Sequence, residues 1–310
     1  MSNRLMKPLS IFKDVPLEDV QLPVWASSKL DGIRSSVSCG VALSNSGTPI
    51  ASELCQALIS DFNRLDGEFI YGDPTAPDCY NKTQSAVNSR VFPSDLDPSE
   101  LRFYVFDYRL PDLKWSERLA YLERLFATTF QGLPHLVLVQ QTKLTQLSEI
   151  EKFYNMQLEL GFEGAIFKQD VHYKEGRSGK TKQCMLRLKP FGNEFFEAKI
   201  VGYECAYHNA NEAETDNLGY TKRSSHASGK IPMDMLGAFI VVDCKSGIEF
   251  RLPASAMRHD ERIRLWKNID DYLGKYVRYT CMTYGQKVKP RMPSFRGFRS
   301  TQDFSPTGEF

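Results

Sequence analysis

The residues of this chain best suited to chemistry lie in one short segment, Lys29-Leu30-Asp31-Gly32-Ile33-Arg34. The segment is predicted to form a tight turn between two apolar, strand-like stretches. Lys29 is a candidate covalent nucleophile, Asp31 places a carboxylate two residues from its amine, and Gly32 allows close approach of the backbone to a ligand. Arg34 suits phosphate or ribose oxygens. On these residues alone, a surface turn with solvated Lys29 and Arg34 explains the segment equally well.

Four further segments have the composition of strands and contain charged or aromatic residues that a nucleotide site needs. In chain order they are Asp66-Gly67-Glu68, Phe103 to Asp107, Glu163-Gly164-Ala165-Ile166-Phe167-Lys168 and Arg187-Leu188-Lys189. The alternation of a strand puts Asp66 and Glu68 on one face, and it does the same for Arg187 and Lys189. A surface strand explains any one of these segments, but it explains the whole set less easily.

Between these segments, the sequence predicts helices and strands that would position them. Ser52 is a candidate N-cap for a helix with apolar residues at Leu54, Ala57, Leu58 and Phe62. Further helices are expected over residues 80–88, 116–130 and 148–160, the last of them ending at Gly161. Strands are expected over residues 23–26, 33–38, 41–43, 65–71, 103–108 and 135–140.

The pattern changes at Pro190-Phe191-Gly192, which predicts two domains, residues 1–190 and 191–310. Strands are then expected over residues 195–203, 236–243, 248–252 and 276–284, with one helix near 261–269. This content in about 120 residues suits a small barrel of the oligonucleotide-binding type. Residues 206–234 are expected to form a long polar loop, and such loops are usually functional or disordered.

The composition is that of an ordinary soluble globular protein, with 42% hydrophobic residues, 25% charged residues and a net charge of +1. Seven scattered cysteines without a CxxC pair favour reduced thiols in a cytoplasm over disulfides or zinc. We expect neither a secretion signal nor a membrane span. The charge is uneven, because residues 272–302 contain seven Lys or Arg and no acidic residue, which favours a local basic face.

In their order, the five chemical segments resemble motifs I, III, IIIa, IV and V of the covalent nucleotidyltransferases. They are most similar to those of the small ATP-dependent DNA ligases of bacteriophages and large DNA viruses. The segment Arg291-Met292-Pro293-Ser294-Phe295-Arg296-Gly297-Phe298-Arg299 resembles the sixth motif region of these enzymes. The resemblance implies an α+β fold: an ATP-grasp-like nucleotidyltransferase domain of antiparallel sheets with flanking helices, followed by a small β-barrel OB-fold domain.

The resemblance also implies a reaction. Lys29 would take AMP from ATP, AMP would pass to the 5′-phosphate at a nick in double-stranded DNA, and the 3′-hydroxyl would displace it. ATP and Mg²⁺, with Mn²⁺ as an alternative, would be the cofactors. We expect a monomer in the cytoplasm, of the host if the source is a phage, without a membrane or an obligate protein partner.

Residue roles follow from the same resemblance. Catalysis is implied for Lys29, Asp31, Arg187 and Lys189. Contacts to the nucleotide are implied for Ser27, Lys29, Arg34, Glu68, Phe106, Lys168, Arg187, Lys189, Arg291 and Arg299. Within this set, Phe106 would stack on adenine and Lys168 would hold the α-phosphate, although a core position explains Phe106 as well. Metal ligation is implied for Glu163 and Glu68, and DNA contact for Lys222, Arg223 and Arg296.

Lys222 and Arg223 lie where some compact viral ligases carry a latch that closes around DNA, although a floppy insertion is an alternative.

Two positions depart from the family pattern. Arg187 stands where relatives usually have lysine, which keeps the charge but changes the geometry. Asn45 stands where many have arginine, which leaves the contact to the 5′-phosphate open.

Other interpretations use the same residues. An RNA ligase or a capping guanylyltransferase would use Lys29 identically, but the predicted barrel argues against many RNA ligases, and Asp303 lacks the following lysine usual in capping enzymes. An NAD-dependent ligase would need a further domain before Lys29. Residues 176–181 resemble the end of a P-loop but fail on spacing. A binder of nucleic acid without catalysis would have no need of the complete set of charged motif residues.

Overall fold

The structure of the chain is a computed structural model, which describes residues 4–190, 195–217, 219–282 and 288–299. The chain divides into two compact units, Met1–Pro190 with Asp216–Tyr220, and Phe191–Thr215 with Thr221–Phe310. Phe191 and Gly192, where the sequence places the domain boundary, lie outside the described residues. The same is true of Tyr284, at the end of a predicted strand, and of Asp303.

The first unit contains two five-stranded sheets. The first sheet has the order β2-β12-β10-β3-β9, formed by Leu9–Ser10, Met185–Leu188, Gly164–Lys168, Val24–Lys29 and Thr142–Leu144. Its strands pair antiparallel except β2, which lies parallel to β12 at the edge of the sheet. Lys29 is the last residue of β3 and faces Gly164 of β10, so a strand end holds it rather than the predicted turn.

The second sheet has the order β5-β4-β6-β7-β8, formed by Val41–Leu43, Ile33–Ser38, Leu65–Tyr71, Leu101–Tyr108 and Leu136–Leu138. Here β8 pairs parallel with β7, whereas the other pairs are antiparallel. A separate parallel pair joins β1 (Met6–Lys7) to β11 (Gly176–Arg177). The predicted strands are confirmed, and the predicted antiparallel sheets gain short parallel strands at these edges, which arrive from distant parts of the chain.

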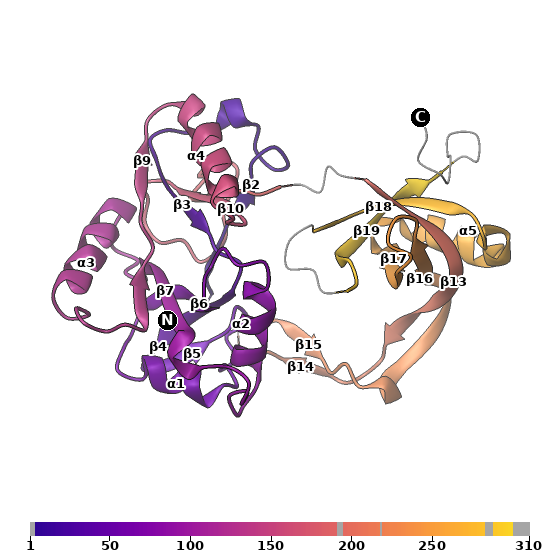
Figure 1. Ribbon diagram of the computed structural model, residues 1–310, viewed down its shortest axis with the longest axis horizontal. Coiled ribbons are helices and arrows are strands. Elements are labelled where there is room, and N and C mark those ends of the chain that lie inside the picture. The colour runs from indigo at the N-terminus through magenta and orange to yellow at the C-terminus, as the bar shows by residue number, and fades with distance from the viewer. Residues whose placement is uncertain (1–3, 191–194, 218, 283–287, 300–310) are drawn as a thin grey trace. The chain divides into compact units, whose positions relative to one another are not determined.

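Helices cover the sheets of the first unit, and Figure 1 shows α4 beside the first sheet. They are α1 (Glu53–Ile59), α2 (Cys79–Asn88), α3 (Trp115–Ala127) and α4 (Leu147–Glu159), with 3-10 turns at Leu17–Asp19 and Pro98–Glu100. The Ser52 hydroxyl caps α1 by accepting from the N–H of Cys55, as predicted. Ala57 is exposed, and the helix buries Cys55 and Ile59 instead, so its predicted apolar face was wrong at Ala57.

Both sheets bury apolar cores. Phe69 of β6 and Phe103 of β7 are fully buried with their ring centroids 4.7 Å apart, and α1, α2 and α3 pack over them. Phe167 of β10 packs with Phe153 of α4 in the core of the first sheet. Glycine is required at Gly164, because its φ is +145° and a Cβ would lie 2.2 Å from the carbonyl oxygen of Leu188. This close packing brings β10 against β12.

The second unit contains one five-stranded antiparallel sheet of order β17-β16-β13-β18-β19. Cα atoms of the two edge strands, β17 and β19, come within 8 Å of each other. Helix α5 (His259–Lys267) buries Leu265 in the core around Phe239. In the order of the sheet, the strands are β17 (Glu249–Pro253), β16 (Lys230–Asp243), β13 (Phe196–Asn209), β18 (Tyr276–Met282) and β19 (Arg291–Phe298). Three 3-10 turns lie at Ala227–Gly229, Ala254–Ala256 and Ile269–Tyr272.

The loop predicted for residues 206–234 is instead a two-stranded ribbon. Strands β13 and β16 stay paired as far as Asn209 opposite Lys230, and a hairpin of β14 (Ala213–Thr215) and β15 (Thr221–Arg223) follows, as Figure 1 shows. The strands of this hairpin are exposed on both faces. The apolar alternation by which a strand is recognised in a sequence is therefore missing, which is why the prediction was wrong.

No helix in the described residues is long and apolar enough to cross a membrane. In the same part of the chain, the cysteines form no disulfide.

Candidate active site

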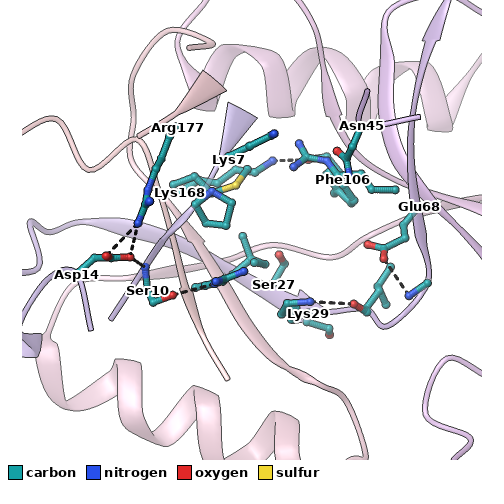
Figure 2. Close-up of a pocket in the computed structure, with 18 of the residues that line it drawn as sticks. Lys7, Ser10, Asp14, Ser27, Lys29, Asn45, Glu68, Phe106, Lys168 and Arg177 are labelled. Atoms are coloured by element: carbon teal, nitrogen blue, oxygen red, sulfur yellow. Dashed lines mark hydrogen bonds and ion pairs between the residues drawn. The ribbon is translucent and has the colours of Figure 1, made fainter. Parts of the chain in front are cut away.

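A pocket of about 580 Å³ in the first unit is lined by residues from both five-stranded sheets (Figure 2). Strands β3, β10 and β12 line it from one sheet, and β4, β6 and β7 from the other. The pocket brings together most of the residues that the sequence predicts for nucleotide contact, namely Ser27, Lys29, Arg34, Glu68, Phe106, Lys168 and Arg187. Segments up to 160 positions apart in sequence order thus meet at one concave site, as expected for a small-molecule pocket.

Lys29 forms an ion pair with Glu163, which precedes β10. The other carboxylate oxygen of Glu163 lies 3.3 Å from Nζ of Lys189, and the Glu163 N–H donates to the carbonyl of Lys29. Burial alone would raise the pKa of Glu163, but the charges of Lys29 and Lys189 outweigh it and hold this pKa below its usual range. One buried carboxylate therefore holds two ammonium groups at the end of β3.

Glu68 lies in β6, where its Oε1 accepts from the N–H of Gly32 at 2.9 Å. Burial raises the pKa of Glu68 to about 7. A Cβ on Gly32 would lie 2.3 Å from the carbonyl oxygen of Phe69. The sequence predicts that glycine permits approach to a ligand, but in the structure it permits the turn to approach β6, and it is this approach that brings the Gly32 N–H to Glu68.

Arg34 is fixed by Asp66, which is fully buried. Its Nε and Nη2 donate to the two carboxylate oxygens at 3.1 and 2.8 Å, and its Nη1 donates to the carbonyl of Met6 at 2.7 Å. Tyr173 adds a further donor to Asp66 at 2.8 Å. Such a bidentate pair gives the guanidinium one orientation. Asp66, which the sequence places beside Glu68, thus serves as the partner of Arg34.

Lys168 is almost completely buried and protein groups hold its amine, so its contact to the α-phosphate stays a prediction. Its Nζ donates to the carbonyl of Phe106 at 2.7 Å and to Asp107 at 3.0 Å, and it lies 3.8 Å from the ring centroid of Trp115. Asp107 also accepts from Nε of Arg118 at 2.8 Å. Burial lowers the pKa of Lys168 to about 8. The charge of Lys168 is therefore compensated beneath the pocket.

Phe106 forms part of the pocket wall above this buried cluster. Its ring packs partly against Leu30 and Val139, and the Lys168 amine and the Arg34 guanidinium each lie 5.4 Å from the ring centroid. The side chain is therefore at once a partly buried core residue and a surface of the pocket, and its stacking on adenine stays a prediction.

The sequence missed one side of the pocket. Residues of the N-terminal segment and of β11 line it, namely Lys7, Ser10, Lys13, Asp14 and Arg177. The parallel pairs β1–β11 and β2–β12 bring them there, and two-residue strands have no periodicity that could have predicted this. From the sequence, Arg177 is considered only as part of residues 176–181, whose resemblance to a P-loop fails on spacing. Asn45 also lines the pocket, so this departure from the family pattern falls within the site.

Asp31 lies in the turn between β3 and β4, and the remaining predicted site residues lie in the second unit. Lys222 and Arg223 are exposed on β15. On β19, Arg296 donates to Oγ1 of Thr280 at 3.0 Å and Arg291 is the first residue. Arg299 follows this strand and forms an ion pair with Glu197 of β13.

The carboxylates of Glu68 and Glu163 fit a magnesium ion of the kind that nucleotides carry. In the described residues, no group of three His, Cys, Asp or Glu could hold a metal unaided. Mg²⁺ in nucleotide sites is commonly bound by one or two carboxylates together with phosphate oxygens and water. Glu163 pairs with the amine of Lys29, and the charges of both Lys29 and Glu163 act on the carboxylate of Glu68.

The fold and the site, with a lysine paired to a buried carboxylate at a nucleotide-sized pocket, fit a covalent nucleotidyltransferase. Comparison with protein families then gives a match of residues 15–189, more than half of the chain, to the ATP dependent DNA ligase domain. The chain belongs to the ATP-dependent DNA ligase family, which seals nicks in DNA. The predictions of a DNA ligase and of ATP as its nucleotide are confirmed.

The solved structures to which the chain is similar include two DNA ligases whose whole chains it matches. The DNA ligase-adenylate of Chlorella virus is 24% identical, with a TM-score of 0.53 over 98% of this chain and 100% of the other. A Lig E DNA ligase is 21% identical, with a TM-score of 0.69 over 96% of this chain and 100% of the other. They confirm the nucleotidyltransferase fold of DNA ligases. The comparison with curated proteins found no match.

Proposed function

We propose that this enzyme seals nicks with a 3′-hydroxyl and a 5′-phosphate in duplex DNA through an AMP group bound to Nζ of Lys29. The observation that carries the proposal is the position of this amine, which lines the pocket and pairs with Glu163, the carboxylate that also binds Lys189. A volume of about 580 Å³ is sufficient for a nucleotide.

Three phosphoryl transfers would follow one another. Nζ of Lys29, after losing a proton, attacks the α-phosphorus of ATP, and the bond to pyrophosphate breaks. An oxygen of the nick 5′-phosphate then attacks the same phosphorus, and the lysine leaves. Finally, the 3′-hydroxyl loses its proton and attacks the 5′-phosphate, which joins the strands and releases AMP. Each transfer depends mainly on positioning and on neutralising charge.

The side chains of the pocket suit this sequence of steps. Arg187 and Lys189 supply positive charge for the α-phosphate, and Glu163 holds Lys29 in place before ATP binds. Phe106 offers a ring for stacking on adenine, with Ser27 near the base, while Arg34 and Glu68 serve the ribose. We assign Lys168 to a supporting role, because its amine holds the carbonyl of Phe106.

Glu163 and Glu68 would hold Mg²⁺, with Mn²⁺ as the alternative ion. When bound, such an ion adds positive charge at the phosphate oxygens. In the free pocket Glu163 pairs with Lys29, so this carboxylate would exchange an ammonium partner for the ion.

We infer that the second unit is an oligonucleotide-binding domain, that the β14–β15 hairpin contacts the DNA backbone, and that the enzyme acts as a monomer. Lys222 and Arg223 support the DNA contact because they are exposed on a ribbon with no core of its own. Deletion of residues 213–229 should weaken binding of nicked duplex about tenfold or more. Unchanged binding, with AMP transfer to Lys29 intact, would exclude this role for the hairpin.

The DNA substrate is tested with protein carrying labelled AMP, which is prepared from ATP and Mg²⁺, freed of ATP and kept in Mg²⁺. Challenge with a nicked DNA duplex should discharge the label and seal the nick. The same challenge with nicked RNA should leave the label on the protein. Discharge by RNA ends alone would replace the DNA ligase proposal with an RNA ligase.

A further inference from the structure

Arg187 is the position where this chain departs from the usual lysine, and the structure gives its guanidinium a specific partner. Nε of Arg187 donates to the hydroxyl of Ser10 at 2.9 Å, as the dashed line from Ser10 in Figure 2 shows. The main chain joins the same segments, because Ser10 is the register partner of Arg187 and the N–H of Ile11 donates to the Arg187 carbonyl at 3.0 Å. Both side chains line the pocket.

Ser10 is itself fixed by a hydrogen bond to Asp14. It is 5% exposed, and its N–H donates to Oδ2 of Asp14 at 2.9 Å. Asp14 accepts from Nη2 of Arg177 at 3.0 Å on both oxygens. The N–H of Ser10 and the charge of Arg177 lower the pKa of Asp14, so this carboxylate stays ionised and the hydroxyl of Ser10 stays in place.

The chemistry of the two basic side chains explains why this contact suits arginine. A guanidinium has a donor at Nε, whereas a lysine has a methylene group at the same distance from the backbone. The hydrogen bond from Nε to Ser10 fixes the orientation of the guanidinium plane. Because the guanidinium is planar, this also fixes the directions in which its two Nη atoms donate. A lysine at this position would gain nothing from the hydroxyl.

We infer that Ser10 is a positioning residue for AMP transfer, which orients the guanidinium of Arg187 toward the transferred phosphate and is supported by Asp14. The inference rests on the proposed function, since it assumes that Arg187 contacts the α-phosphate. It also gives the N-terminal segment a role in the reaction, and it accounts for the presence of arginine in place of lysine on β12.

The test is a set of variants assayed for AMP transfer from α-labelled ATP to the protein in a single turnover, over a range of ATP concentrations. Ser10→Ala should slow the rate constant at saturating ATP about tenfold, the loss typical of one hydrogen bond from a charged group. Ser10→Thr keeps the hydroxyl and should recover most of the rate. Ser36→Ala is the matched control, because its buried hydroxyl has no hydrogen-bond partner in the described structure, and it should leave the rate unchanged.

The decisive comparison uses Arg187→Lys. In that background Ser10→Ala should have no further effect, since the donor that the hydroxyl serves is absent. An equal slowing in both backgrounds would overturn the inference, because it would mean that Ser10 only supports the β2–β12 pair. So would an unchanged rate for Ser10→Ala in the parent. In either case labelling of the parent protein itself would leave the proposed function standing, whereas a parent that takes no label would refute both.

Discussion

Asp107 beneath the pocket gives the sharpest test of how the first unit is stabilised. Its carboxylate is fully buried and accepts from Lys168 at 3.0 Å and from Arg118 at 2.8 Å, whose side chains are 2% and 1% exposed. Burial alone would raise the pKa of Asp107, but the charges of Lys168 and Arg118 hold it below its usual range. Asp107→Asn keeps the volume but leaves two buried cations without a counter-ion. Breaking such a cluster costs about 3–5 kcal/mol in the free energy of unfolding.

The assay is urea unfolding at pH 7, followed by tryptophan fluorescence, to which Trp115 contributes with a ring that lies against both cations. Lys168→Met should lower the free energy of unfolding less than Asp107→Asn does. In that variant Asp107 keeps its ion pair with Arg118, and the methionine side chain fills the space over Trp115. Asp78→Asn, which removes an exposed pair with Lys82, is the control and should leave the free energy of unfolding unchanged. If Asp107→Asn is no more destabilising than this control, the stabilising role of the buried cluster is refuted.

Three further predictions concern the same pocket. Glu163→Gln should slow AMP transfer to Lys29 about a hundredfold in a single-turnover assay, because it removes the carboxylate that holds two lysines, and a normal rate would contradict that role. Phe106→Leu should raise the KM for ATP about tenfold in the same assay through lost stacking, and an unchanged KM would leave Phe106 a core residue only. Burial lowers the pKa of Lys168 to about 8, from about 10.4 in an unfolded chain, so between these values the unfolded chain binds more protons. The free energy of unfolding of the parent should therefore rise relative to Lys168→Met from pH 8 to pH 10 in urea titrations, and a flat difference would show that the pKa is not lowered.

The sequence predicts the centre of the pocket well, because each of its strands combines strong local strand propensity with a charged residue at a fixed position. Lys29, Glu68 and Phe106 therefore appear where the motif order places them. The hydrogen-bond and ion-pair partners of the pocket residues could not be predicted from the sequence, because they depend on which strands pair. The sequence places Asp66 only on the same strand face as Glu68, and it is the pairing of β4 with β6 that makes it the counter-ion of Arg34.

The largest gap concerns segments whose position depends on contacts distant in sequence. Strands β1 and β2 are two residues long, so no periodicity indicates them, and it is their parallel pairing with β11 and β12 that places Ser10 beside Arg187. The ribbon formed by β14 and β15 escapes prediction for the opposite reason, because its exposed faces carry no apolar pattern.

The central claim is that AMP is carried by Nζ of Lys29, and the most direct measurement is covalent labelling of the protein with ATP labelled at the α-phosphate in the presence of Mg²⁺. The parent should take up one AMP, with the label in the peptide that contains Lys29. Lys29→Ala, which removes the nucleophile, and Lys29→Arg, which keeps the charge but cannot attack, should take up none. Label on either variant at the level of the parent, or on a peptide without Lys29, would contradict the account.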